Sequence, residues 1–118
     1  MGDEAWSKIA RTSLGQAQRR VVSRDSLSYQ TSIERPRGTQ PIEVEIVDLS
    51  IWGFQARCGF ARFDRGEPVR LNLPLIGLQD AQVRWSLRGC FGAQFHQPVD
   101  ARAYLDVLAV VAPSRPGR

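Results

Sequence analysis

The chain has 118 residues, of which 42% are hydrophobic and 24% are charged, and its formal net charge is +4. This length predicts one small domain, and the apolar content is enough to bury a core, which excludes global disorder. No apolar run approaches the ~20 residues of a membrane span, and residues 1–18 lack the apolar centre of a signal peptide. We therefore expect a cytoplasmic domain without membrane contact.

The positive charge is unevenly distributed along the chain. Residues 1–24 carry a net charge of +3 and residues 113–118 carry +2, whereas the body between them carries −1. A barrel that binds DNA or RNA would be expected to spread its positive charge across one face of the fold. We expect no nucleic-acid partner, although a basic arm that holds a small anion remains compatible with this distribution.

Residues 1–18 are predicted to form a flexible arm. Within them, residues 3–11 have the spacing of a short helix, and a frayed terminus explains the same pattern equally well. From Leu27 onward the apolar period becomes two, which is typical of half-buried strands. Six such segments follow one another at roughly ten-residue intervals: residues 27–34, 42–47, 54–58, 69–73, 81–85 and 91–95.

The pattern changes to a helical period after Pro98. Asp100 is a candidate N-cap, and residues 101–111 place an apolar stripe on one face, formed by Tyr104, Leu105, Leu108 and Val111. Six short strands indicate a closed antiparallel barrel or a sandwich. We predict a mainly all-β fold, a six-stranded antiparallel barrel spanning about residues 27–95, with the C-terminal α-helix burying its stripe over an open barrel end. Residues 113–118 are predicted to be a disordered tail.

Few residues are available for metal or redox chemistry. Cys58 and Cys90 are far apart without CxxC spacing, and we expect reduced, buried thiols. His96 is the only histidine, which excludes a histidine-rich metal site. A Ser-His-Asp triad would have to use it. Phe63 is predicted to anchor the loop before the fourth strand, and Trp85 is predicted to lie in the core.

Two short motifs carry the functional signal. Asp48, Ser50 and Gly53 stand between two strands, where Asp and Ser side chains set up turns and also offer an acceptor and a donor to a polar ligand. Arg20 and Arg24 lie four residues apart upstream. Taken alone, the first motif is equally compatible with a capped turn, and the arginines with a solvated charge cluster.

The order RxxxR, then DxSxxG some two dozen residues later, resembles the PilZ family, the bacterial receptors for the second messenger cyclic di-GMP. Residues 82–85, Gly89 and residues 92–95 are similar to the last strand pair of that family. The resemblance extends over roughly residues 19–111. It implies a PilZ domain at residues 19–112 with a PilZ-type β-barrel.

The resemblance also implies a site and its chemistry. The guanidinium groups of Arg20 and Arg24 would clamp phosphate or the edge of guanine, since arginine forms bidentate bonds with both. Asp48 would accept from the guanine N–H groups, Ser50 would bond phosphate or a base edge, and Gly53 would allow close approach of the backbone. The implied ligand is cyclic di-GMP, with no cofactor and no metal.

Arg19 directly precedes the RxxxR motif. A basic residue there resembles family members that bind a stacked pair of dinucleotides, so one or two ligands per chain are both open. The implied function is that of a receptor or adaptor, not an enzyme, which signals through ordering of the arm to an unknown protein partner.

Two other interpretations remain open. A degenerate PilZ-like scaffold would dock a protein partner through Trp52 and Phe60 without binding nucleotide. A small hydrolase would use Ser50 with His96 and Asp48, but no GxSxG elbow surrounds that serine.

Overall fold

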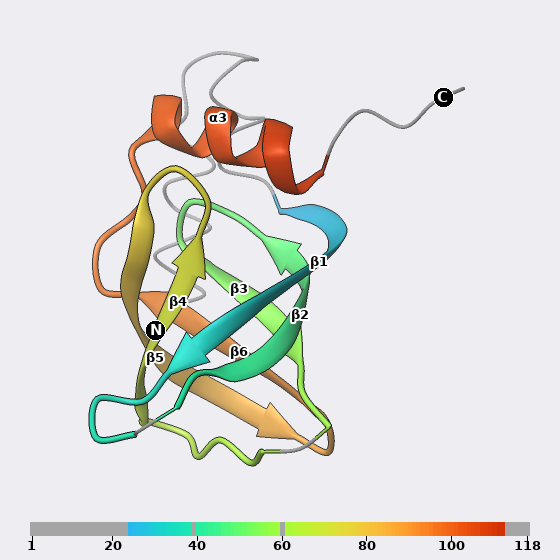
Figure 1. Ribbon diagram of the computed structural model, residues 1–118, viewed down its shortest axis with the longest axis vertical. Coiled ribbons are helices and arrows are strands. Elements are labelled where there is room, and N and C mark those ends of the chain that lie inside the picture. Colours follow the sequence, from blue (N-terminus) through green and yellow to red (C-terminus); the bar gives the residue numbers. More distant parts are fainter. Residues whose placement is uncertain (1–23, 39, 60, 113–118) are drawn as a thin grey trace.

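The computed structural model describes residues 24–38, 40–59 and 61–112. Within these residues, six strands precede one helix, α3 (Ala101–Val111), as Figure 1 shows. The strands are β1 (Asp25–Glu34), β2 (Ile42–Leu49), β3 (Gly53–Arg57), β4 (Pro68–Leu73), β5 (Gly77–Leu87) and β6 (Cys90–Phe95). They pair antiparallel in the order β1-β2-β3-β6-β5-β4, and β4 returns to β1. The predicted six-stranded antiparallel barrel with a C-terminal helix is confirmed.

The core fills the barrel because alternate residues of each strand point inward. In β4, Val69, Leu71 and Leu73 are at most 2% exposed, while the residues between them are exposed. Phe63 is buried against the Phe91 ring, with centroids 4.3 Å apart, so the loop after β3 is anchored as predicted.

Helix α3 covers one end of the barrel (Figure 1). Asp100 caps it by accepting a hydrogen bond from the amide of Ala103 at 3.1 Å. Its buried side chains are Tyr104, Val107 and Val111. The predicted stripe was wrong at one position: Leu105 is 45% exposed, and Val107, one turn beyond Ala103, takes its place in the core.

Register shifts in β2 and β5 change which face two key residues occupy. In β2 the shift lies between Ile46 and Asp48, so Asp48 pairs with Gln55 and Leu49 pairs with Phe54. Uninterrupted alternation from Val44 and Ile46, both buried, would have sent Asp48 into the core. The bulge turns its carboxylate to the barrel's outer face and sends Leu49 inward instead.

The bulge in β5 overturns the prediction for Trp85. Val83 pairs with Ala93, but the next pair is Trp85 with Gly92, so one residue of β5 is inserted and the alternation reverses. Trp85 is half-buried on the outer face, where a Cβ added to Gly92 would lie 2.2 Å from the indole Nε1. The ring packs on the bare backbone of that glycine rather than in the core.

Both cysteines are free thiols. Cys58 is buried as expected, whereas Cys90 is only half-buried, because it is the first residue of β6 and points to the outer face. No helix in the described ranges is long and apolar enough to cross a membrane. Among the described residues, no group of three or more His, Cys, Asp or Glu side chains could hold a metal ion.

Candidate functional site

The candidate site forms where the start of β1 lies against the end of β2. Antiparallel pairing places Asp25 opposite Leu49 and Ser26 opposite Asp48. Arg24, directly before β1, is thereby brought beside Asp48, with 3.6 Å between Nη1 and Oδ2. The arginine side chain is 51% exposed and the aspartate 21%. One residue from each motif thus meets on the outer surface, although the two are 24 positions apart in the chain.

The Asp48 carboxyl has an unusual environment for a surface aspartate. Burial raises its pKa above the ordinary value of 3.8, and the neighbouring positive charge of Arg24 only partly offsets this. The negative charge of Asp25 raises the pKa further. Oδ1 is buried and has no hydrogen-bond partner among the described residues. The carboxylate therefore retains an acceptor atom that the described part of the fold does not satisfy.

Ser50 supports the loop from within. It is 2% exposed, its Oγ accepts a hydrogen bond from the amide of Trp52 at 3.0 Å, and its own amide donates to the carbonyl of Gly53 at 2.9 Å. This is the local serine turn expected from the motif. The hydroxyl is not displayed on the outer surface beside Arg24 and Asp48.

Gly53 is required by strand packing. A Cβ at this position would lie 2.2 Å from the carbonyl oxygen of Ala93 and 3.0 Å from the Cα of Gln94, both on the backbone of β6. The close approach that excludes a side chain is thus between β3 and β6. The predicted role of Gly53, to let the backbone approach a ligand, stays a prediction.

Several predicted residues lie outside the described residues. Arg19 and Arg20 belong to the undescribed residues 1–23, and Phe60 is also undescribed. The convergence of the whole arm on the loop therefore stays a prediction. Trp52 is half-buried and packs against the core, and its carbonyl accepts from the amide of Phe95 at 2.8 Å, so it serves as a packing anchor.

One residue pair at this site was not predicted from the sequence. The Tyr104 hydroxyl on α3 hydrogen-bonds the Asp25 carboxylate and lies 3.1 Å from the carbonyl oxygen of Leu49. Burial, and secondarily Asp25, raise the pKa of Tyr104. Two features of the sequence were relevant: Asp25 directly follows Arg24, and Tyr104 carries a hydroxyl on the apolar face of the helix. Neither feature identifies a partner 79 positions away in the chain.

The hydrolase interpretation receives no support from the described geometry. The Ser50 Oγ accepts from a backbone amide, and no hydrogen bond among the described residues joins it to His96. The histidine is exposed, with its amide donating to the carbonyl of Asp80 on β5.

Comparison with known proteins identifies the fold. Neither a family model nor a curated protein matches the chain. One similar solved structure is the PilZ domain of CeSA from a cellulose-synthesizing bacterium, with a TM-score of 0.55 and 16% sequence identity. The match covers 75% of this chain and 94% of that one. The chain therefore has a PilZ-type fold, which confirms the fold that the RxxxR and DxSxxG resemblance implied.

Proposed function

We propose that this protein is a cytoplasmic cyclic di-GMP receptor or adaptor. The RxxxR arm and the DxSxxG loop would hold the ligand between them. The observation that carries the proposal is the contact between Arg24 and Asp48. A PilZ-type barrel brings one residue from each motif together at a single point on its outer surface. The proposed ligand contacts are the side chains of Arg19, Arg20, Arg24 and Asp48, and Ser50 and Gly53 contribute to the site by shaping the DxSxxG loop whose backbone faces the ligand.

The chemistry of the two residues suits an exchange of partners. Arg24 lies at 3.6 Å from Asp48, which is longer than a well-formed charge-assisted hydrogen bond of about 2.7–2.9 Å. The Arg24 guanidinium would donate hydrogen bonds to a ligand phosphate, and the Asp48 carboxylate would accept them from the N–H groups of a guanine. Each charged group then gains a shorter, better-aligned partner, so the ligand replaces one loose ion pair with two charge-assisted contacts.

The position of Arg24 also suits a signal based on ordering of the arm. It directly precedes Asp25, whose carboxylate is held by Tyr104 of the helix that covers the barrel end. Ligand phosphates would pull the arm that carries Arg19 and Arg20 toward this fixed point. A segment ordered by new arginine–phosphate contacts is a common form of molecular switch.

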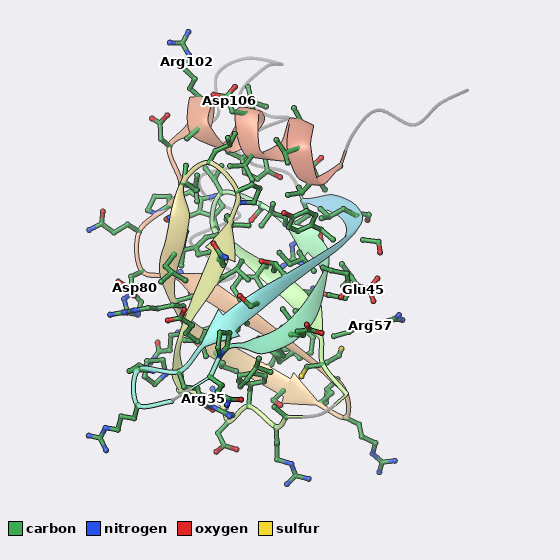
Figure 2. All side chains as sticks on the ribbon, in the orientation of Figure 1. Arg35, Glu45, Arg57, Asp80, Arg102 and Asp106 are labelled. Atoms are coloured by element: carbon green, nitrogen blue, oxygen red, sulfur yellow. The ribbon has the colours of Figure 1, made fainter. Side chains whose placement is uncertain are left out.

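The test is calorimetric titration of cyclic di-GMP into the full chain and two variants. Arg24→Ala should weaken binding about 5- to 150-fold, because a bidentate arginine contact to guanine contributes about 1–3 kcal/mol. Arg102→Ala is the matched control, since Arg102 is an exposed arginine on α3 that forms no ion pair with any described residue (Figure 2). It should bind like the parent.

Two results would contradict the proposal. If Arg24→Ala binds as tightly as the parent, that residue has no part in the clamp. If the parent shows no binding at saturating ligand, the chain is instead a PilZ-like scaffold that docks a protein, for which Trp52 and Phe60 are the predicted contacts.

A further inference from the structure

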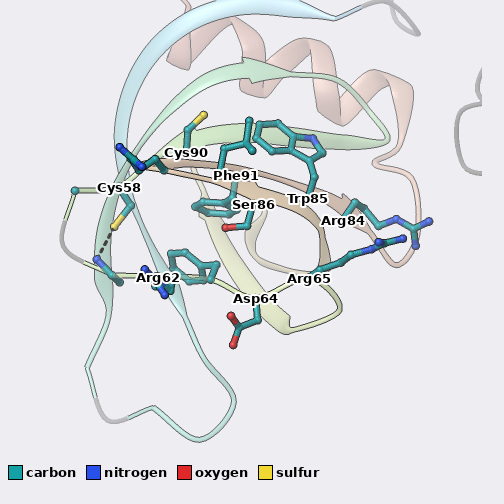
Figure 3. Close-up of a pocket in the computed structure, with 15 residues that line it drawn as sticks. Cys58, Arg62, Asp64, Arg65, Arg84, Trp85, Ser86, Cys90 and Phe91 are labelled. Carbon is teal, nitrogen blue, oxygen red and sulfur yellow. Dashed lines mark hydrogen bonds between the residues drawn. The ribbon is translucent and has the colours of Figure 1, made fainter.

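A groove of about 920 Å³ is shown in Figure 3. The loop after β3 and the β5–β6 hairpin, which line it, lie at the end of the barrel remote from α3 (Figure 1). The walls of the groove come from the loop after β3, residues 58, 59 and 61–65, and from the β5–β6 hairpin, residues 84–91. It is separate from the candidate ligand site: Gly53, in that site, and Arg57, beside the groove, stand at opposite ends of β3.

Four arginines line this groove, and one acidic residue, Asp64, accompanies them. The arginines are Arg62, Arg65, Arg84 and Arg88. None of the four forms an ion pair within the described part of the chain, whereas four of the six other described arginines do, namely Arg24, Arg35, Arg57 and Arg70. The ten arginines and ten carboxylates of the described residues balance, so this groove is a local excess of positive charge.

The backbone holds two of these arginines next to each other. The amide of Gly66 donates to the carbonyl of Val83 at 2.7 Å, and the amide of Val83 donates to the carbonyl of Glu67 at 2.9 Å. Arg65 and Arg84 directly flank this pair of bonds, and their side chains extend in the same direction in Figure 3. Two guanidinium groups placed together repel each other, and an anion between them would relieve that repulsion.

The loop that carries Arg62 and Arg65 is fixed from its other side. Arg35 hydrogen-bonds the carboxylate of Glu67 and the carbonyl oxygen of Arg62, and its guanidinium lies 4.5 Å from the centre of the Phe63 ring. The basic groups therefore project from a positioned loop, which lowers the entropic cost of binding a partner.

Apolar surface accompanies the charge. Trp85 lines the groove and is half-exposed above Gly92, and Leu87 at the hairpin is 70% exposed. Arginine and tryptophan are the residues most enriched at the energetic centres of protein–protein interfaces. Anion sites built for phosphate alone more often use the amides of a helix N-terminus, and this groove is walled by strands and a loop.

We propose that the groove docks an acidic segment of a partner protein, with Asp or Glu carboxylates on the four arginines and an apolar side chain against Trp85 and Leu87. Charge complementarity selects this occupant, because arginine binds carboxylates bidentately. The chain's own ends do not fit, since residues 1–24 and 113–118 are both positively charged. Nucleic acid is disfavoured, since the described surface beyond the groove carries no excess of positive charge.

The test measures fluorescence anisotropy with a labelled short peptide of alternating glutamate and leucine, at about 50 mM salt so that screening is weak. A matched peptide with glutamine in place of glutamate and a labelled oligothymidine are the comparison probes. Arg65→Glu and Arg84→Glu should each weaken binding of the acidic peptide about fivefold or more, and the double variant should abolish it. Arg102→Glu changes the net charge equally at the opposite end of the molecule and should alter binding less than twofold (Figure 2).

Circular dichroism melts and cyclic di-GMP titration of each variant show that the barrel and the other site are intact. The proposal is overturned if the acidic peptide does not bind the parent saturably, or if the glutamine peptide binds as well. It is equally overturned if Arg102→Glu weakens binding as much as the groove variants do. Tighter binding of oligothymidine, lost in the same groove variants, would reassign the groove to nucleic acid.

Discussion

The hydroxyl of Tyr104, in the middle of α3, hydrogen-bonds the carboxylate of Asp25, the first residue of β1. Arg24 directly precedes that aspartate, and the Leu49 carbonyl that the same hydroxyl approaches directly follows Asp48. One buried phenol thus joins the covering helix to the base of the arginine arm and to the loop that carries the second motif. A ligand that shifts Arg24 or Asp48 would therefore alter the position of α3 through the hydrogen bond between Tyr104 and Asp25.

Tyr104→Phe should destabilise the fold by about 1–3 kcal/mol, because Asp25 and the Leu49 carbonyl lose a buried donor. Urea denaturation measures this change. The pH dependence follows from the raised pKa of Tyr104. The native state keeps the phenolic proton above pH 10 while the unfolded chain releases it, so the parent's stability falls as pH rises beyond about 10. The variant should lack that loss, and identical alkaline slopes would contradict the assignment.

Asp48→Asn should separate stability from binding. Burial raises the pKa of the Asp48 carboxyl, so the folded state binds the proton more tightly than the unfolded chain. Parent stability should therefore fall as pH rises through the window that starts at the ordinary pKa of 3.8. The asparagine variant should be at least as stable as the parent at pH 7, with the difference vanishing in acid, and it should bind cyclic di-GMP more weakly. A variant that loses stability at pH 7 would show that the ion pair with Arg24 outweighs burial.

Gly53→Ala should destabilise the barrel by about 1–3 kcal/mol, the usual range for overpacking, because the added methyl group meets the backbone of β6. Gly59→Ala is the matched control, since a Cβ there meets nothing within 4 Å. Thermal denaturation compares the two variants. Equal melting temperatures would mean that β3 and β6 separate at no cost, contrary to the register in which Gly53 pairs with Gln94.

Arg19→Leu tests the number of ligands. Three arginines in or beside the RxxxR motif exceed what the two phosphates of one cyclic di-GMP engage, and we predict that Arg19 favours a stacked pair. The parent should then bind two ligands per chain, and the variant one, as measured by calorimetric stoichiometry. A 1:1 titration of the parent at saturation would remove this role from Arg19 and leave it a solvated charge, worth roughly 0–1 kcal/mol.

Leu75→Asn should stabilise the protein by about 1 kcal/mol. Leu75 lies in the β4–β5 turn with φ of +74° and is 70% exposed, so its backbone is strained and its side chain gains little packing in return. Asparagine adopts this conformation more readily. Chemical denaturation gives the comparison, with Leu87→Asn as the control for replacing an equally exposed leucine in the β5–β6 hairpin. A destabilised Leu75→Asn variant would indicate that the leucine makes contacts worth more than the strain.

Local patterns in the sequence were sufficient for the architecture. Period-two alternation located all six strands, and the change of period after Pro98 located α3 with its cap at Asp100. Alternation reflects which side of a strand meets water, and that preference is encoded residue by residue. The RxxxR and DxSxxG spacings likewise pointed to the PilZ-type fold without any knowledge of which strands pair.

The tertiary structure decided what depends on register. A bulge in β2 turns Asp48 outward toward Arg24, and a bulge in β5 moves Trp85 from the predicted core to the rim of the arginine groove. An inserted residue reverses every side chain beyond it, yet it leaves no mark on local composition because it arises from pairing with another strand. The same holds for Tyr104 and Asp25, whose contact exists only because α3 closes the barrel end where β1 begins.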